Sequence, residues 1–275
     1  MNLEQAYAAP RPALAVPGVE GGRKALAFRS GMAVAGRADL DVRHGHHPRH
    51  VHDLFVPESD AGGPVALFLH GGAWQGPRAG KDRFSHLAGG LCSLGMPVAV
   101  ASYRLCPETE ISSIIGDARQ LAAHLARRME RPVVAVGHGA GAHLAVCLLA
   151  TDWMARGFET DIVPAACGIS GIYDLRPLIG SSHNEALGLD EMSAFAASPL
   201  MWPAPGGKRL RLVVGGEDND ARILQSRALE AAWRGCGVQV SCEIRAEADR
   251  AGLLAELEKP QAPLTQAVHA LSLGA

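Results

Sequence analysis

The sequence predicts an α/β fold in which a mostly parallel sheet is covered by helices on both faces. Short apolar runs alternate along the chain with amphipathic segments, as parallel strands alternate with crossover helices. One apolar run, 132–136, leads through a glycine-rich turn, 137–141, into a helix-like stretch that extends to residue 150. In sheets of this kind, ligand sites lie beyond the carboxyl ends of the strands.

The expected strands are continuous apolar runs, and the segments between them have helical character. The strands are expected at 51–56, 65–70, 98–103, 133–137, 165–169, 210–215 and 238–244. The helices are expected at 82–94, 114–128, 140–150, 221–235, 252–257 and 264–271.

The alternation indicates one α/β domain over residues 36–275, without an internal repeat. Residues 1–35 are rich in Ala, Pro and Gly and lack a clear period, so we expect an N-terminal extension packed on that domain. Residues 172–208 are rich in Ser, Pro and Gly, and we expect them to form an excursion over the site.

Composition argues against several classes of partner. The chain has 275 residues, is 48% hydrophobic and carries a net charge of -2. It should therefore bury a sizeable core and have no general attraction for nucleic acid or anionic membranes. Residues 1–16 lack the pattern of a signal peptide, and no run approaches the ~18 apolar residues of a membrane span.

The six cysteines show no C-x-x-C pair or metal-type spacing, so we expect a reduced, cytoplasmic protein. Cys147 and Cys167 lie in apolar stretches and are expected to pack in the core. The sequence indicates no metal and no cofactor, and it permits a homodimer without specifying one.

The turn Gly137-His138-Gly139-Ala140-Gly141 has the setting of a nucleophile elbow, whose pattern is G-x-S-x-G. The serine position holds Gly139, which has no side chain and cannot attack a substrate. A second segment, His70-Gly71-Gly72-Ala73-Trp74, follows an expected strand and is typical of oxyanion-binding loops. The expected N–H donors are those of Gly71, Gly72 and Ala140, although a plain glycine turn is the alternative.

Taken together, several segments resemble bacterial kynurenine formamidases (arylformamidases) and their esterase relatives. The matching segments are H-G-G-A-W (70–74), Y-R-L-x-P-E (103–108), G-H-G-A-G-A-H-L-A (137–145), I-S-G-I-Y-D-L (169–175), A-L-G-L-D (186–190), S-P-L (198–200) and Q-S-R (225–227). The resemblance extends from about residue 50 to the C-terminus. It implies the α/β-hydrolase fold and an ancestor that cleaved acyl or formyl groups from small aromatic molecules.

The resemblance also implies where a catalytic acid and base should lie. Asp218 best fills the acid position, with Glu217 beside it. The base should be a histidine near the C-terminus, but the matching position holds Arg250. A guanidinium stays protonated at any ordinary pH, so Arg250 cannot accept a proton as a general base. We therefore expect ordinary serine hydrolysis to be absent, and two simultaneous changes favour natural divergence over an engineered single substitution.

The altered site suggests a ligand instead. Arg250, oriented by Asp218, would hold negative charge, because arginine can grip a carboxylate with parallel hydrogen bonds. The oxyanion donors would polarise an acyl oxygen without a covalent intermediate, as a lyase, cyclase, isomerase or decarboxylase requires. Trp74 would shape the pocket. His138 could act as an acid or base, although packing beside the elbow is the simpler interpretation.

Three alternatives remain open. The protein could be an esterase or amidase that uses an activated water or a displaced base. It could be a catalytically inactive partner protein. Alternatively, Arg250 could merely pair with Asp218 or Asp249 in a decayed pocket.

Other reactive side chains have simpler interpretations. Residues 44–52 contain five of the twelve histidines, and His50 and His52 have the spacing that places two side chains on one face of a strand. Because no carboxylate or cysteine pattern accompanies them, we expect a surface hairpin rather than a metal site. Cys106 and Ser170 also follow expected strands, but neither stands on an elbow beside a base.

Overall fold

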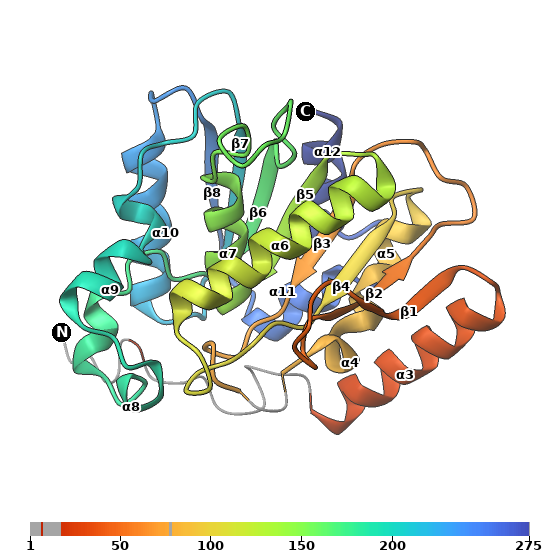
Figure 1. Cartoon of the computed structure of the whole chain (residues 1–275), viewed down its shortest axis with the longest axis horizontal. Coiled ribbons are helices and arrows are strands. Elements are labelled where there is room, and N and C mark those ends of the chain that lie inside the picture. The colour runs from red at the N-terminus through yellow and green to blue at the C-terminus, as the bar shows by residue number, and fades with distance from the viewer. Residues whose placement is uncertain (1–6, 8–17, 77–78, 275) are drawn as a thin grey trace.

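The computed structural model describes residue 7, residues 18–76 and residues 79–274. An eight-stranded sheet forms the centre of the molecule, in the order β1-β2-β4-β3-β5-β6-β7-β8 (Figure 1). The strand β2 pairs antiparallel with β1 and β4, and the remaining pairs are parallel. The predicted, mostly parallel sheet is confirmed. Its strands are β1 (Ala38–Arg43), β2 (Val51–Phe55), β3 (Val65–Leu69), β4 (Val98–Ala101), β5 (Val133–His138), β6 (Ala165–Ile169), β7 (Arg209–Gly215) and β8 (Gln239–Arg245).

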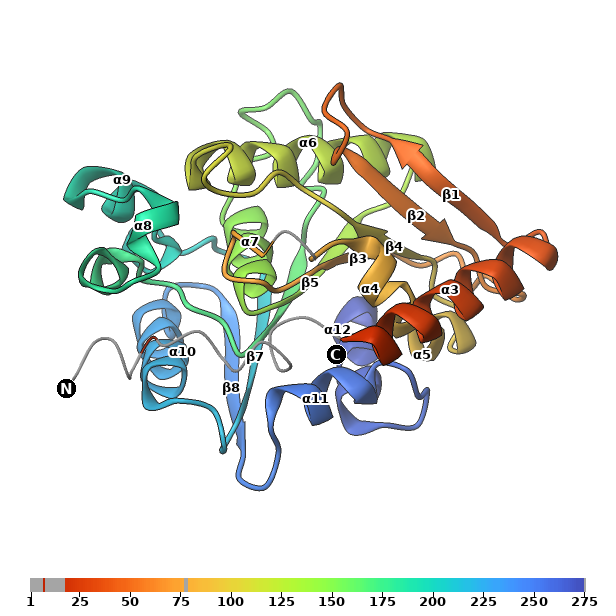
Figure 2. The ribbon, with the colours of Figure 1, turned by 90° about the horizontal axis from the view of Figure 1, so that it is seen from below.

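Helices cover both faces of the sheet (Figures 1 and 2). The α-helices are α3 (Val19–Val34), α4 (Lys81–Phe84), α5 (Gly89–Ser93), α6 (Ile111–Met129), α7 (Ala140–Leu149), α8 (Asn184–Leu187), α9 (Glu191–Ala196), α10 (Asp220–Trp233), α11 (Arg250–Glu256) and α12 (Pro263–Leu273). Short 3₁₀ helices are η1 (Ser85–Ala88), η2 (Arg176–Gly180) and η3 (Pro199–Met201). None of the helices among the described residues combines the length and the apolar character needed to cross a membrane.

The alternation of side chains along β3 explains the two layers of core. Val65, Leu67 and Leu69 belong to a cluster that also contains side chains from α6, α7 and α10. Ala66 and Phe68 point the other way, into a cluster with side chains from α3, α5, α11 and α12. A strand buried on both faces reads as an unbroken apolar run, because successive residues alternate between the faces.

The structure corrects three features of the prediction. Helix α3 was missed because its apolar residues are scattered around its circumference, and Val19, Leu26 and Val34 are largely exposed. Strand β1 was missed because it is a half-exposed edge strand rather than an apolar run. The expected helix 82–94 is divided into α4, η1 and α5. Gly90 allows close packing there, since a Cβ on it would collide with the carbonyl of Leu257.

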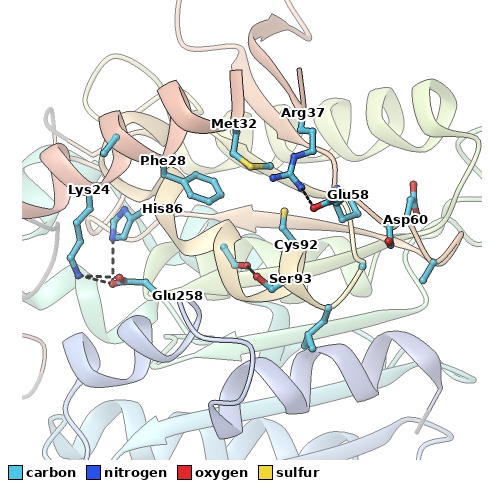
Figure 3. Close-up of a pocket in the computed structure, with 17 residues that line it drawn as sticks. Lys24, Phe28, Met32, Arg37, Glu58, Asp60, His86, Cys92, Ser93 and Glu258 are labelled. Carbon is cyan, nitrogen blue, oxygen red and sulfur yellow. Dashed lines mark hydrogen bonds and ion pairs between the residues drawn. The ribbon is translucent and has the colours of Figure 1, made fainter. Parts of the chain in front are cut away.

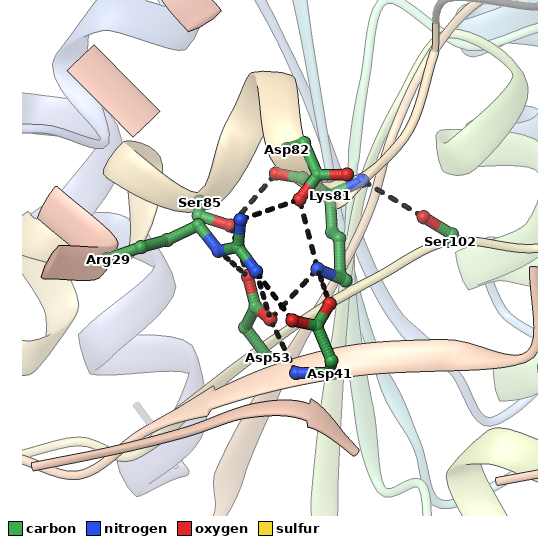
Figure 4. A network of polar contacts seen from close by, with 7 residues as sticks. All are labelled: Arg29, Asp41, Asp53, Lys81, Asp82, Ser85 and Ser102. Carbon is green, nitrogen blue, oxygen red and sulfur yellow. Dashed lines mark hydrogen bonds and ion pairs between the residues drawn. The ribbon is translucent and has the colours of Figure 1, made fainter. Parts of the chain in front are cut away.

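A buried network of charges connects α3 and α4 to the sheet (Figure 4). Arg29 Nε and Lys81 Nζ both contact the fully buried carboxylate of Asp53, at 2.8 and 3.0 Å. Ser85 Oγ donates to the same carboxylate at 2.9 Å, and Lys81 also pairs with Asp41. Because each buried charge has a partner, the network can hold α3 and α4 in place without leaving an isolated ion in the core.

Candidate functional site

Gly139 lies at the sharp turn between β5 and α7, beyond the carboxyl end of a central strand. Its backbone has φ +55° and ψ -115°, and its carbonyl accepts hydrogen bonds from the N–H groups of Ala142 and His143. A Cβ built on Gly139 would have one neighbour within 4 Å, the Cα of Gly71 at 3.8 Å. The turn therefore has the geometry of an elbow, with open space where a side chain would project.

The other two glycines of the turn allow the strand and the helix to pack closely. A Cβ on Gly137 would collide with the carbonyl of Gly141, and a Cβ on Gly141 would collide with the carbonyl of Leu69 in β3. Glycine is required at such points because the backbones approach within the radius of a methyl group. The G-x-G-x-G pattern thus follows from backbone packing and does not depend on the residue at position 139.

The loop after β3 faces the elbow and has an unusual backbone. Gly72, Ala73 and Trp74 all have positive φ, at 127°, 52° and 60°. Non-glycine residues adopt such angles only when their surroundings hold them, and such strain is concentrated at functional sites. The Gly72 carbonyl accepts from the N–H groups of Gln75 and Gly76, which closes the turn.

Aromatic and hydrogen-bonding contacts of His70 fix the start of this loop. The ring of His70 stacks between Tyr103 and Phe84, with centroids at 4.2 and 5.7 Å. Tyr103 Oη donates to the His70 carbonyl at 2.6 Å, and His70 Nδ1 donates to the Gly71 carbonyl at 2.7 Å. Burial lowers the pKa of His70 to about 3, so its ring is neutral. His70 therefore positions the loop.

A small pocket lies between the loop and the elbow. It leaves about 30 Å³ for the centre of a water-sized molecule. A single water needs roughly 10–15 Å³ on this measure, so the pocket has room for a few non-hydrogen atoms. Its wall is formed by Gly72, Ala73, Trp74, His138, Gly139, Ala140, Ile172, Leu178, His183, Arg222 and Arg250.

Asp218 and Arg250 meet beside this pocket. Arg250, the first residue of α11, forms an ion pair with Asp218, with 2.6 Å between Nε and Oδ1. The two side chains are 10% and 1% exposed. Ser170, at the end of β6, donates to the other carboxylate oxygen of Asp218. Asp249 caps α11 by accepting from the N–H of Gly252. Burial lowers the pKa of Arg250, and the charges of Asp218 and Asp249 oppose that shift.

A second arginine, which the sequence did not single out, also lines the pocket. Arg222 lies in the first turn of α10 and is 6% exposed. Its Nε and Nη1 have no hydrogen-bond partner among the described residues. Burial, followed by the charge of Arg250, lowers the pKa of Arg222 to about 10, so it remains a cation at neutral pH. The sequence-based reasoning missed it because an arginine on an amphipathic helix usually reaches solvent.

His138 and Trp74 add unpaired polar atoms to the same wall. The two ring nitrogens of His138 have no hydrogen-bond partner among the described residues, and the indole Nε1 of Trp74 has none either. Burial, Arg250 and Arg222 lower the pKa of His138 to about 3, so the ring is neutral. Buried polar atoms without partners are costly, and several around one pocket are typical of a site completed by a ligand or water.

Of the three expected backbone N–H donors, two lie on the pocket wall and one lies behind it. Gly72 and Ala140 line the pocket, and their N–H groups donate to no other described residue. Gly71 lies behind the wall, because a Cβ on it would be 2.6 Å from His138 Nδ1. Ala73 is on the wall in its place.

Residues outside the pocket have structural contacts. His143 Nε2 lies 2.7 Å from the Ala197 carbonyl, and its ring packs edge-on against Trp74. Ser170 is bound to Asp218, and Cys106 is buried without lining the pocket. Cys147 and Cys167 are fully buried, as expected. The excursion over residues 172–208 contributes Ile172, Leu178 and His183 to the pocket wall, and its helices α8 and α9 lie together at one side of the molecule (Figures 1 and 2).

The histidine-rich segment forms the expected hairpin between β1 and β2, but three of its histidines do not lie on the surface. His44, His50 and His52 are buried, because their rings pack together and approach His124 of α6. His50 Nε2 lies 3.1 Å from Asp117. Across the described chain, no group of three or more His, Cys, Asp or Glu side chains is arranged to hold a metal ion.

A wider hollow of about 1180 Å³ lies elsewhere, between α3 and α5 (Figure 3). Its wall includes residues 57–61 and 92–95, which precede β3 and β4. It is therefore at the amino ends of parallel strands, opposite to the usual position of a site. Several of the labelled polar groups also pair with one another, as Lys24 does with Glu258 at 3.0 Å. We do not assign it a catalytic role.

Comparisons with known proteins agree with this architecture. The BD-FAE family model matches residues 52–231. Kynurenine formamidase of Danio rerio is 28% identical over 229 residues, covering 79% of this chain and 76% of that protein. A candidate thioesterase structure from Silicibacter sp. TM1040 has a TM-score of 0.84 at 30% identity and covers 98% of this chain and 99% of its own.

An esterase from the archaeon Pyrobaculum calidifontis has a TM-score of 0.68 at 16% identity, covering 93% of this chain and 92% of that one. At that identity the likeness concerns the fold alone. These matches confirm the resemblance to formamidases and esterases that the sequence motifs predicted, and they confirm the α/β-hydrolase fold.

Proposed function

The chain belongs to the BD-FAE family, and from this premise we propose that its pocket binds a small acyl- or carboxylate-bearing molecule without forming an acyl-enzyme. One observation carries the proposal. The pocket that contains Gly139 at the elbow is also lined by Arg250, which pairs with Asp218 beside the pocket. The position that would supply a nucleophile has no side chain, and the position that would supply a base has a permanent cation.

Ordinary serine catalysis is incompatible with these residues. Gly139 offers no hydroxyl, and Arg250 holds its proton at neutral pH. In a well-studied serine protease, losing the triad lowers turnover by ~10⁶, which leaves only oxyanion stabilisation and binding. The family relationship thus supplies the scaffold and the pocket, while this chain's own residues argue for different chemistry within them.

The donors around the pocket suit a ligand with exposed oxygens. The N–H groups of Gly72 and Ala140, joined by that of Gly71 if the loop relaxes, would polarise an acyl oxygen. Arg250, held by Asp218, would balance negative charge on the ligand. This arrangement supports an enolate or similar oxyanion without a covalent bond to the protein, as in a lyase, isomerase, cyclase or decarboxylase.

His138 provides a route for proton transfer that depends on the ligand. In the empty pocket, burial and the two arginines keep the pKa of His138 near 3, which makes it a weak base. A bound carboxylate would offset those cations and raise the pKa of His138, since an opposite charge stabilises the imidazolium. Proton transfer would then follow only after the acidic ligand has bound.

The proposal is tested by combining turnover and binding. Wild-type protein should hydrolyse p-nitrophenyl acetate and N-formylkynurenine no faster than buffer does, while short acyl or carboxylate compounds should raise its Tm. Arg250→Gln should abolish the ligand-induced shift, and the exposed Arg23→Gln should retain it. Turnover sensitive to fluorophosphonates, or the absence of any ligand-induced shift, would contradict the proposal.

A second candidate is a partner protein, and one observation favours it. Met192 and Phe195 on α9 are 82% and 52% exposed. Exposed apolar side chains that lie close together can mark a protein interface. A shift to a larger species in light scattering, lost in Met192→Glu, together with no small-molecule binding, would favour this candidate over the first.

A further inference from the structure

We propose that Arg222 selects the ligand of this pocket, restricting it to small monocarboxylates rather than neutral acyl compounds. This inference rests on the proposed function and narrows its ligand class. It starts from the one guanidinium in the pocket that has no carboxylate partner among the described residues.

Arg222 is 6% exposed, and its Nε and Nη1 have no acceptor among the described residues. Arg250, by contrast, is bound to Asp218 at 2.6 Å. A buried guanidinium without an acceptor destabilises the empty protein, because it loses hydration without gaining a hydrogen bond. Such a residue is expected where a ligand provides the missing acceptor.

Arg222 and Arg250 are the two guanidiniums on the pocket wall. Arg250 pairs with Asp218, so one positive charge, that of Arg222, has no paired carboxylate among the described residues. His138 adds none, because its ring is neutral at pH 7. One negative charge on the ligand would balance the site. Neutral amides and esters would leave the charge unpaired, and dianions would exceed it.

The indole Nε1 of Trp74 is a further unpaired group on the wall, beside those of Arg222 and His138, and like a guanidinium it can only donate. The free N–H groups of Gly72 and Ala140 are donors as well. A ligand in this position must therefore present several acceptor oxygens, which a carboxylate does and an alkyl amine or alcohol does not.

The pocket has space for a few non-hydrogen atoms. Ile172 and Leu178 supply the apolar part of its wall. A carboxylate with a short alkyl chain, such as propionate, matches this space, with its charged end toward Arg222 and its carbon chain toward the aliphatic side chains.

Calorimetric titration with matched probes tests the inference. Propionate should bind the wild-type protein, whereas propionamide, its neutral counterpart, should bind at least about tenfold more weakly. Arg222→Gln should lower propionate affinity by about tenfold or more, in line with the loss of a charged hydrogen bond. Arg227→Gln, an exposed arginine on the same helix, should leave the affinity unchanged.

The titration results distinguish a failure of the role of Arg222 from a failure of the proposed function. Equal binding of propionate and propionamide, or unchanged affinity in Arg222→Gln, would overturn the role of Arg222 and leave the proposed function standing. If the wild-type protein binds neither propionate nor propionamide nor any other acyl or carboxylate probe, both the role of Arg222 and the proposed function are overturned.

Stability provides a second readout that does not require a ligand. Arg222→Met removes an unpaired buried cation while keeping much of the side-chain volume, so the ligand-free Tm should equal or exceed that of the wild type. A fall of several degrees would mean that Arg222 supports the fold, which would overturn its assignment as a ligand-binding residue.

Discussion

Arg250 and Asp218 form a buried ion pair, with 2.6 Å between Nε of the arginine and Oδ1 of the aspartate. The resemblance to formamidases implies that Asp218 would hold a histidine base in an active relative. In this chain the carboxylate holds a guanidinium instead, and Ser170 donates to its second oxygen. The aspartate thus retains an orienting position, although its partner cannot accept a proton.

Removing the aspartate should destabilise the protein. In Asp218→Asn, Arg250 would lose its carboxylate and two buried cations would face each other, so we expect the free energy of unfolding to fall by about 3 kcal/mol. Urea denaturation measures the change. Asp220→Asn, an exposed residue at the start of α10, should cost less than about 1 kcal/mol.

The double variant Asp218→Asn with Arg250→Met checks the cause of this loss. It should recover part of the stability, because the second substitution removes the unpaired cation. Additive losses in the two single variants would contradict a direct pairing.

Restoring the two changed positions should create an esterase. Gly139→Ser places a side chain in open space, since its Cβ would meet one atom within 4 Å, at 3.8 Å. With Arg250→His beside Asp218, hydrolysis of p-nitrophenyl acetate should rise at least about a hundredfold over the wild type, the range of general acid–base catalysis. Neither single variant should show this gain.

A serine at another left-handed glycine serves as the control. Gly188 has φ +60° and open space around its Cβ, so Gly188→Ser with Arg250→His should remain inactive. If the Gly139→Ser and Arg250→His pair is also inactive while folded, the assignment of these positions is wrong.

The buried histidines should make the protein sensitive to acid. Burial lowers the pKa of both His44 and His52 to about 3, from 6.5. Between these values the unfolded chain binds more protons, so stability is complete above pH 6.5 and falls as the pH drops toward 3. Each such residue contributes about 1.4 kcal/mol per pH unit within this window.

His52→Leu should therefore shift the acid-unfolding midpoint to lower pH, as followed by circular dichroism. The exposed His46→Gln should leave the midpoint unchanged. An unchanged midpoint in His52→Leu would show that His52 does not control acid unfolding.

The charge network in Figure 4 should be sensitive to the loss of its lysine. Lys81 is 2% exposed and contacts the buried Asp53 at 3.0 Å. Lys81→Met should lower the free energy of unfolding by about 3 kcal/mol, because Asp53 would keep only Arg29 as its cation. Lys24→Met, whose side chain is 46% exposed in its pair with Glu258, should cost no more than about 1 kcal/mol. Equal effects in urea denaturation would contradict the structural role of the network.

Sequence patterns predicted the central sheet because strands that are buried on both faces appear in the sequence as continuous apolar runs. The strand β6 has the predicted bounds, 165–169, since it is a continuous apolar run with every residue buried. The edge strand β1 was not predicted because only one of its faces is partly buried. Helix α3 was not predicted because few of its residues are buried, and the ion pair of Arg29 with Asp53 helps to hold it on the sheet. The contacts of β1 and α3 are made with residues that are distant in the sequence, so a local hydrophobic pattern does not reveal them.

The site was predictable to a similar degree. The glycine turn, the loop at 70–74 and Asp218 follow strands directly, so their positions could be expected from the topology. Arg222 is buried at a pocket that it shares with Arg250, which is distant in the sequence, whereas its residue type alone suggested a solvent-exposed helix face. His44 and His52 gave the opposite error, because His124 of α6 packs against rings that composition assigned to the surface.

The central claim is that this pocket forms no acyl-enzyme, and peptide-resolved mass spectrometry tests it most directly. Wild-type protein is incubated with p-nitrophenyl acetate, digested and searched for acetyl groups. The account predicts no adduct on any residue that lines the pocket of Gly139, Arg222 and Arg250. An acetyl group on His138, or on another side chain of that wall, would contradict it.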